Sequence, residues 1–157
     1  MAVKSIPDGY HSVTPYLIVR DAASAIDFYR KAFGAEPRTR MDGPGGKVMH
    51  AELKFGNSYI MLADEMPDMG FVGPQSLGGS SISILLYVDD VDVRFKQAVA
   101  AGASVSRPLE DQFYGDRSAT LQDPFGHVWT IATHKEDVSE AEMSRRFEAI
   151  MKGPGGA

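Results

Sequence analysis

Apolar and polar positions follow the same order in two separate stretches of this chain. In the first, an apolar run at residues 16–19 meets Asp21, and apolar residues then recur at helical spacing until Gly34. In the second, an apolar run at residues 84–88 meets Asp90, and helical spacing continues until Gly102. Spacings of three and four residues place apolar side chains on one helix face, and an aspartate before them is a suitable N-cap. Each stretch therefore predicts a strand followed by a capped helix.

The segments after the two predicted helices also match. The first has a strand at residues 37–41, the glycine turn DGPGG, and two strands in KVMHAELKFG and NSYIMLADE. The second has SVSRP, a polar loop, SATLQ, the turn DPFG and HVWTIATH. The pattern predicts an α+β fold of two tandem βαβββ modules, at residues 10–63 and 82–134. Their helices would lie on one side, and their curved, mostly antiparallel sheets would surround a cleft on the other.

The chain is expected to be a single domain, 1–157, because its length supports one core. Residues 64–81 join the modules and are rich in Gly, Pro and Ser, yet they include Met66 and Phe71. Two readings stay open for this segment, a plain linker and a lid over the cleft. Residues 135–157 predict a C-terminal helix and tail, in which Ser139 and Glu142 have capping-box spacing. Its apolar face would pack on the body or on a second subunit.

Charge and cysteine content narrow the chemistry. The formal net charge is −5 and no basic patch is visible, which argues against a nucleic-acid partner. No apolar run is long enough to span a membrane, and the first residues do not resemble a signal peptide. A cytoplasmic location is therefore expected. With no cysteine in the sequence, thiolate metal sites and cysteine nucleophiles are excluded.

The paired pattern resembles the glyoxalase/bleomycin-resistance/dioxygenase superfamily, also called vicinal oxygen chelate (VOC) proteins. The resemblance rests on YLIVRDAASAIDFYRKAFGA, YVDDVDVRFKQAVAAGA and DPFGHVWTI, and it covers residues 10–134. The residue order in MHAELKFGNSYIMLADE and DPFGHVWTIATH is most similar to that of the PhnB-like branch. The resemblance implies paired βαβββ modules, a homodimer and a cup-shaped cleft that binds a small molecule.

In metal-using members of this superfamily, the resemblance implies ligands at one position in the first and last strand of each module, and these ligands are His, Gln or Glu. The corresponding residues here are Thr14, Met61, Ser83 and Thr130. Hydroxyl groups and a thioether are weak ligands for the ions that such sites hold. We therefore expect no metal and no other cofactor, and metal-dependent glyoxalase or dioxygenase activity is not expected.

His50 and Glu52 are the candidate catalytic residues. They alternate with Met49, Ala51 and Leu53 along one predicted strand, so Val48, His50 and Glu52 would share the cleft face. A carboxylate beside an imidazole can tune it as a general base. The alternatives are a salt bridge at the rim and a pair that only contacts the ligand.

Other residues on the predicted cleft face are candidates for ligand binding. Tyrosine suits a ligand site because it combines a flat apolar body with a hydroxyl group. Arg117 can pair with an anionic group, and the alternative is a surface salt bridge with Asp111 or Asp116. By strand parity, Trp129 belongs to the core, and His127 is expected to be structural. The candidate ligand-binding residues are Tyr16, Tyr59, Met61, Tyr87, Tyr114, Arg117 and Thr130.

Three functions follow from these features. The first is a protein that binds a small organic ligand in the cleft without a metal. The second is a VOC-type isomerase, lyase or group-transfer enzyme that uses His50 and Glu52 as an acid–base pair or as recruited metal ligands. The third is an interaction protein with a closed cleft. Whether the chain is an enzyme stays open at this point.

Overall fold

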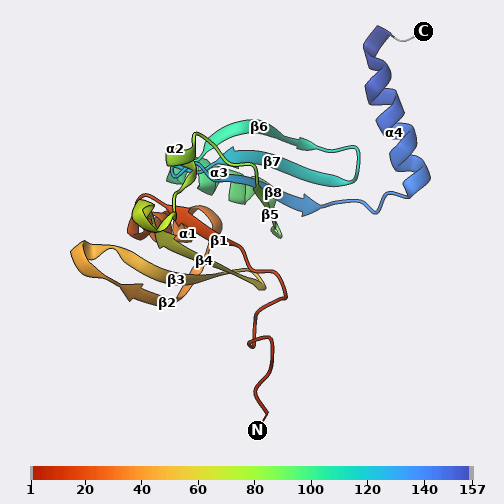
Figure 1. The fold of residues 1–157 in the computed structure, drawn as a ribbon. Helices are drawn as coiled ribbons and strands as arrows, with labels where there is room; N and C mark the ends of the chain where they lie inside the picture. Colours follow the sequence, from red (N-terminus) through yellow and green to blue (C-terminus); the bar gives the residue numbers. More distant parts are fainter. Residues whose placement is uncertain (1, 156–157) are drawn as a thin grey trace.

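Residues 2–155 are described by a computed structural model, in which two four-stranded mixed sheets carry one long helix each (Figure 1). In the first sheet the strand order is β1-β4-β3-β2, and in the second it is β5-β8-β7-β6. The first and last strands of each module pair in parallel, and the other pairs are antiparallel. The predicted α+β fold of two βαβββ modules is confirmed.

The strands and helices follow one another in the predicted order. The first module contains β1 (Tyr16–Val19), α1 (Ala22–Phe33), β2 (Glu36–Asp42), β3 (Val48–Phe55) and β4 (Ser58–Asp64). The second contains β5 (Ser83–Tyr87), α3 (Val91–Ala101), β6 (Ser104–Asp111), β7 (Asp116–Gln122) and β8 (Val128–His134). Much of the predicted polar loop of the second module is strand, because β6 and β7 form a long hairpin that turns at residues 112–115.

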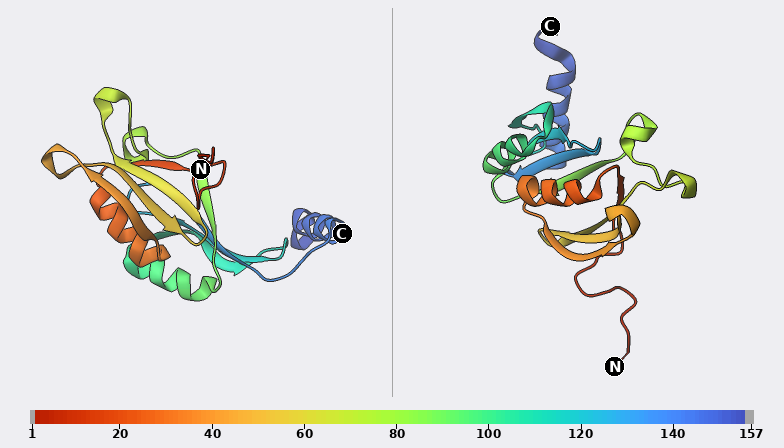
Figure 2. Two further views of the ribbon diagram at one scale, coloured as in Figure 1. Left: turned by 90° about the horizontal axis from the view of Figure 1, so that it is seen from below. Right: turned by 90° about the vertical axis from the view of Figure 1, so that its left-hand side faces the viewer.

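Both long helices begin and end where the sequence predicts. The Asp21 carboxylate accepts a hydrogen bond from the Ser24 amide at 3.0 Å, and the Asp90 carboxylate accepts one from the Val93 amide at 3.1 Å. Gly34 ends α1 at a φ of 68°, a left-handed conformation that glycine adopts without steric cost. The two helices lie side by side and pack on each other as well as on their own sheets (Figure 2).

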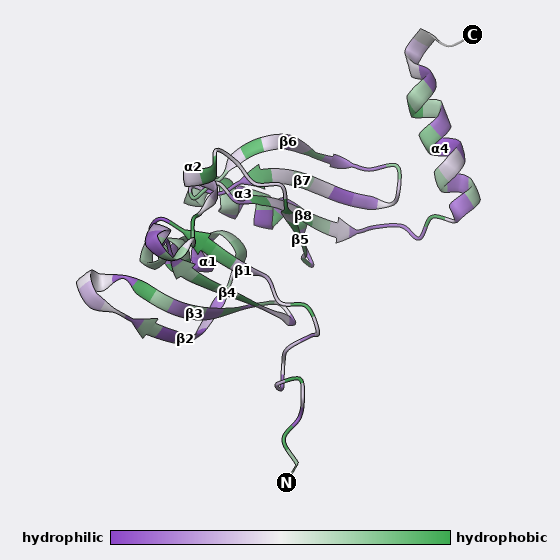
Figure 3. Cartoon of the chain, viewed as in Figure 1, coloured by the Kyte–Doolittle hydropathy of each residue, from purple (hydrophilic) through white to green (hydrophobic). Residues whose placement is uncertain are grey.

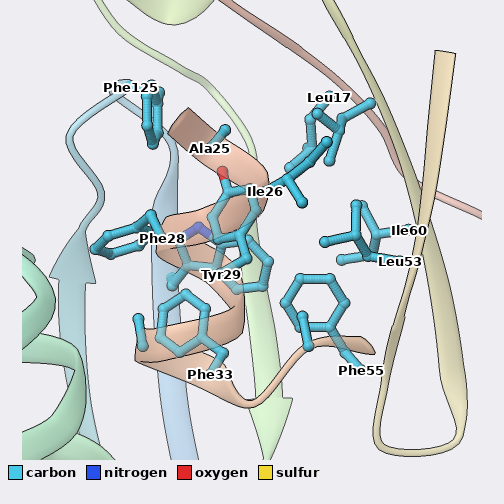
Figure 4. Packing of buried hydrophobic residues seen from close by; sticks show 14 of the residues in the cluster. Leu17, Ala25, Ile26, Phe28, Tyr29, Phe33, Leu53, Phe55, Ile60 and Phe125 are labelled. Atoms are coloured by element: carbon cyan, nitrogen blue, oxygen red, sulfur yellow. The ribbon is translucent and has the colours of Figure 1, made fainter. Parts of the chain in front are cut away.

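One core joins the inner faces of the two sheets. The Trp129 side chain is fully buried, and its ring lies 5.4 Å from that of Phe55 and 4.7 Å from that of Phe33 between centroids. Tyr29 and Phe28 of α1 complete this aromatic cluster (Figure 4). Since side chains alternate along a strand, the remaining residues of each sheet point away from the core. We call these surfaces the first outer face (Tyr16, His50, Glu52, Tyr59, Met61) and the second outer face (Ser83, Leu85, Tyr87, Thr120, Thr130).

The predicted parity of β3 is wrong at its first two residues. Val48 is fully buried in the core and Met49 is 37% exposed, whereas His50 and Glu52 lie on the first outer face as predicted. The pairing of β2 with β3 explains the difference, since Met41 pairs with His50 and the next residue, Asp42, pairs with Val48. Met49 is therefore an extra residue in β3 with no partner on β2. Such a β-bulge reverses the side-chain alternation on the strand that contains it.

The segment between the modules has its own structure. Short helical turns occur at Pro67–Met69 and Pro74–Leu77, the latter being α2. The Glu65 carboxylate accepts hydrogen bonds from the Gly73 amide at 2.7 Å and the Ser76 hydroxyl at 2.6 Å. These contacts fasten both ends of α2 to the end of β4.

Helix α4 (Glu140–Lys152) stands clear of the two sheets (Figure 3). Ser139 caps it by accepting a hydrogen bond from the Glu142 amide at 3.3 Å, as the capping-box spacing predicts. None of its residues is buried, and Phe147, Ile150 and Met151 are exposed. It contacts the β6–β7 turn, where Arg146 donates a hydrogen bond to the Phe113 carbonyl at 3.2 Å and the Phe147 ring lies 5.6 Å from that of Phe113.

Candidate functional site

His50 is the centre of a hydrogen-bonded network on the first outer face. Its Nε2 lies 3.1 Å from Oε1 of Glu52, and its Nδ1 lies 2.9 Å from the hydroxyl of Tyr16. Because a carboxylate only accepts, we assign the imidazole proton to Nε2, which leaves Nδ1 to accept from Tyr16. The side chains of His50 and Glu52 are 25% and 22% exposed, so the pair is accessible from solvent. Strand β3 supplies the pair, and β1 supplies Tyr16.

Tyr10 is a fourth member of this network, and sequence reasoning missed it. Its hydroxyl donates a hydrogen bond to Oε2 of Glu52, and its ring stacks on Tyr59 with a centroid distance of 4.4 Å and an interplanar angle of 16°. Hydrogen bonds from Tyr10 and then His50 lower the pKa of Glu52. Burial and the nearby Glu52 carboxylate raise the pKa of Tyr10. The alternation of side chains along a strand makes no prediction for Tyr10, because Tyr10 precedes β1.

Two cavities flank the network. One, of about 490 Å³, lies between residues 5–12 on one side and Thr14, Glu52 and Met61 on the other. The second, of about 350 Å³, lies where Met66 and Phe71 of the segment between modules approach Tyr16. The polar group formed by His50 and Glu52 is therefore bordered by space for organic groups.

The second outer face has a separate polar network. Asp116 is 5% exposed, and its carboxylate accepts hydrogen bonds from Tyr87 at 2.8 Å and from Nδ1 of His134 at 2.7 Å. Nε2 of His134 lies 2.9 Å from a carboxylate oxygen of Asp137. Hydrogen bonds to Asp137 and Asp116 raise the pKa of His134, and the bond to Asp116 raises that of Tyr87.

The other predicted residues of the second module have partners of their own. The hydroxyls of Thr130 and Thr120 lie 3.1 Å apart. Arg117 contacts Asp92 at 3.0 Å and Asp111 at 3.3 Å, as in the surface salt-bridge reading. Tyr114 packs against Phe113 with ring centroids 5.2 Å apart.

His127 has a structural contact, as predicted. Its Nε2 lies 3.0 Å from the backbone carbonyl of Ile18. Ile18 belongs to β1 and His127 lies just before β8, so this contact links the first sheet to the second.

Only part of the predicted cleft lining comes together within one chain. A cavity of about 460 Å³ at the junction of the modules is lined by Thr14 and Tyr59 from the first module and by Leu85 and Tyr87 from the second. His50 and Glu52 do not line it, and neither do Tyr114, Arg117 and Thr130. Most candidate residues thus form one group on each outer face, and Tyr59 and Tyr87 of the two groups line the same cavity. Arg117 is the exception, because it lies on the helix side of the second sheet, where it contacts Asp92 of α3.

The superfamily's metal positions do not fit a metal in this chain. Thr14, Met61, Ser83 and Thr130 offer three hydroxyl groups and a thioether, and the Thr130 hydroxyl is engaged by Thr120. Divalent ions that prefer oxygen or nitrogen need carboxylate or imidazole ligands that converge. Over residues 2–155, no three His, Asp or Glu side chains gather closely enough to hold one.

The sequence and the fold are those of a known superfamily. The sequence profile of the Glyoxalase/Bleomycin resistance protein/Dioxygenase superfamily matches residues 9–131, and the chain belongs to this superfamily. The match covers the first module and nearly all of the second, and it includes Thr14, Met61, Ser83 and Thr130. In the described part of the chain, no helix is both long and apolar enough to cross a membrane.

Similar proteins occur in bacteria and in a plant. The uncharacterized protein Rv0887c of Mycobacterium tuberculosis is 45% identical over 147 residues, which cover 92% of this chain and 84% of the relative. The crystal structure of TioX from Micromonospora sp. ML1 superposes with a TM-score of 0.64 at 27% identity, covering 79% of this chain and 98% of TioX. The PhnB protein from Bacillus cereus shares the fold, with a TM-score of 0.61 at 16% identity and coverages of 78% and 99%.

Proposed function

We propose that this protein binds a small organic ligand on its first outer face without the metal that other members of the superfamily use. The observation that carries the proposal is the group formed by His50, Glu52, Tyr16 and Tyr59, which combines polar groups with an aromatic wall beside two cavities. Ligand sites in proteins commonly have this composition, with a few polar groups set in apolar surroundings. The neutral residues at the metal positions favour binding without a metal.

The second outer face completes the proposed site from another copy of the chain. Leu85 and Tyr87 are 48% and 59% exposed, as is expected of side chains that a partner covers. In a homodimer with two-fold symmetry, the first outer face of each chain can oppose the second outer face of its partner. This arrangement would bring Tyr87, Tyr114 and Thr130 to a ligand held at His50, whereas Arg117 stays with Asp92 on the helix side of the second sheet. A cytoplasmic location belongs to the same proposal.

A ligand screen tests the proposal. Small aromatic and polar compounds are screened by thermal shift, and hits are mapped by NMR on labelled protein. We expect shifted resonances at residues 50–54 and 58–63, and Tyr59→Ala should weaken binding about ten-fold or more, equivalent to about 1.4 kcal/mol. Val93→Ala, on the exposed side of α3, is the control. Hits that bind Tyr59→Ala as tightly as wild type would contradict the proposed site.

Two further measurements test the metal-free site and the homodimer. Elemental analysis of protein purified without chelator should find well below one metal ion per chain. A stoichiometric metal that is lost on changing His50 and Glu52 would overturn the metal-free site. Analytical ultracentrifugation should give twice the mass of one chain, and a monomer at micromolar concentration would rule out the completed cleft.

A second candidate function is a metal-free acid–base enzyme acting on a small oxygenated compound. The contact of 3.1 Å between Nε2 of His50 and Glu52 favours it, since Glu52 orients the imidazole so that Nδ1 can serve as the base for a substrate that takes the place of the Tyr16 hydroxyl. Once a ligand that is converted has been found, His50→Ala should reduce its turnover at least about 100-fold. Equal turnover by wild type and His50→Ala would remove this candidate.

A further inference from the structure

The N-terminal segment is held to the first outer face by one side chain. Within residues 2–13, every residue is exposed except Tyr10. The remaining contact of this segment with the sheet is weak, with Nε2 of His11 lying 3.3 Å from the Asn57 carbonyl. In Figure 1 the beginning of the chain extends away from the body. The Tyr10 side chain is therefore the anchor of a segment that is otherwise solvated.

The contacts of Tyr10 are of the kind that a bound aromatic ligand would make. Its ring lies on Tyr59 in a stacked geometry, and its hydroxyl donates to Glu52. Gly9 permits this approach, because a Cβ atom there would lie 2.9 Å from the Tyr59 ring. Gly9 also has a φ of 85°, which favours glycine. The aromatic wall and the carboxylate together recognise a planar ring with a hydrogen-bond donor at its edge.

Charge narrows the class of ligand further. One oxygen of Glu52 is engaged by His50, so the other is left to accept from whatever stacks on Tyr59. An aromatic carboxylate would place a second negative charge beside Glu52, which is unfavourable in a partly buried site. A hydroxyl group satisfies the carboxylate without that repulsion, and hydrogen bonds to a charged acceptor are the stronger ones.

We propose that the Tyr59–Glu52 subsite binds planar aromatic compounds that carry a hydroxyl group, and that Tyr10 occupies this subsite until such a compound displaces it. This inference rests on the proposed function, since it names the ligand class for the same face. The N-terminal segment then acts as a tethered competitor. Its release costs little surface burial, because the segment has one anchor.

The probe for this subsite is 4-methylphenol, which has the structure of the tyrosine side chain. It is titrated by NMR into wild-type protein and into Tyr10→Ala, with shifts followed at residues 52 and 59. We expect Tyr10→Ala to bind the probe with a dissociation constant on the order of 1 mM. Wild type should bind the probe about ten-fold more weakly, because Tyr10 leaves the subsite in only a minor fraction of the molecules. Toluene, which lacks the hydroxyl group, should bind Tyr10→Ala several-fold more weakly than 4-methylphenol.

Tyr10→Phe keeps the stacked ring and removes the hydrogen bond to Glu52, so its affinity for the probe should lie between the other two. It also serves if Tyr10→Ala loses its fold. The inference is overturned if 4-methylphenol binds wild type and the Tyr10 variants equally, if it fails to bind a folded Tyr10→Ala, or if toluene binds as well.

Failure of this inference can be separated from failure of the proposed function. If screened ligands shift residues of the first outer face but bind wild type and Tyr10→Ala with equal affinity, the proposed function stands and the competitor role of Tyr10 falls. If 4-methylphenol binds Tyr10→Ala as expected while no compound reaches the face of wild type, the subsite stands and the proposed function falls.

Discussion

The two modules have the same backbone plan, yet they contribute unequally to the core. Helix α1 buries seven residues, including Phe28, Tyr29 and Phe33, whereas α3 buries only Val91 and Ala98. Counted from the capping aspartates, Phe28 corresponds to Gln97. The first module therefore supplies most of the aromatic core, and the second reaches into it through Trp129. The repeat of the chain specifies strand and helix order, while the side chains decide which module carries the stability.

The outer faces differ in a similar way. On the first, His50 and Glu52 are partly exposed and lie beside two cavities. On the second, Asp116 is buried and is held by Tyr87 and His134. Both networks join a tyrosine, a carboxylate and a histidine, but only the first leaves its carboxylate and imidazole open on one surface. For this reason the proposed ligand site is on the first module.

The largest expected effect comes from the DPFG turn. The Asp123 carboxylate is 4% exposed and accepts hydrogen bonds from Tyr29, Trp129 and two backbone amides. Asp123→Ala leaves these donors without a partner and should cost about 3–5 kcal/mol in the free energy of unfolding. Asp64, the buried aspartate of the first module, accepts from two amides, so Asp64→Ala should cost about 2–3 kcal/mol.

Urea unfolding measures both values, and Asp68→Ala on the exposed segment between modules is the control, expected to change stability by less than about 0.5 kcal/mol. A smaller loss for Asp123→Ala than for Asp64→Ala would show that the turn does not join the two modules energetically.

The unequal helices give the next effect. Phe28→Ala removes a ring that is 6% exposed and should destabilise the protein by about 3–4 kcal/mol. Gln97→Ala at the corresponding position of α3 changes an exposed residue and should stay within about 0.5 kcal/mol. Chemical denaturation of the two variants measures the difference. Equal losses would mean that α3 carries as much of the core as α1.

The capping aspartates should have smaller and more equal effects. Asp21→Ala and Asp90→Ala each remove an N-cap hydrogen bond and should cost about 1 kcal/mol. Asp21 also accepts from the Ser24 hydroxyl at 2.7 Å, so its loss should be the larger of the two. Thermal unfolding of both variants, with Asp21→Asn and Asp90→Asn as controls that retain a cap, tests the order.

The smallest effect is the pH dependence from His134. Since its pKa is raised in the folded protein by Asp137 and Asp116, protonated His134 stabilises the fold. This contribution is complete below the unfolded pKa of about 6.5 and is lost as pH rises through the raised value. The melting-temperature difference between wild type and His134→Gln should therefore shrink from pH 6 to pH 9. His11→Gln, which removes an exposed histidine far from this pairing, is the control. A difference that grows with pH would contradict the assigned pairing.

Local patterns account for what the sequence predicted well. Hydrophobic periodicity and the capping residues Asp21, Asp90 and Ser139 located the helices, because these signals act within a few residues. Alternation placed Trp129 in the core and His50 and Glu52 on the opposite face. It failed at Val48, since a β-bulge depends on how two strands pair and leaves no mark in the pattern of one strand.

Contacts between distant segments account for what the sequence missed. Tyr10 meets Glu52 and Tyr59 only because the segment before β1 folds back on the first sheet. The partners of Arg117 and His134, Asp92 and Asp137, are likewise set by how the helices and the chain end lie against the second module. The sequence by itself determined the repeat, the element order and the neutral residues at the metal positions, because those are properties of local order and residue type. Only the tertiary structure decided which side chains share a face and which hydrogen bonds form, because those depend on the packing of residues far apart in the chain.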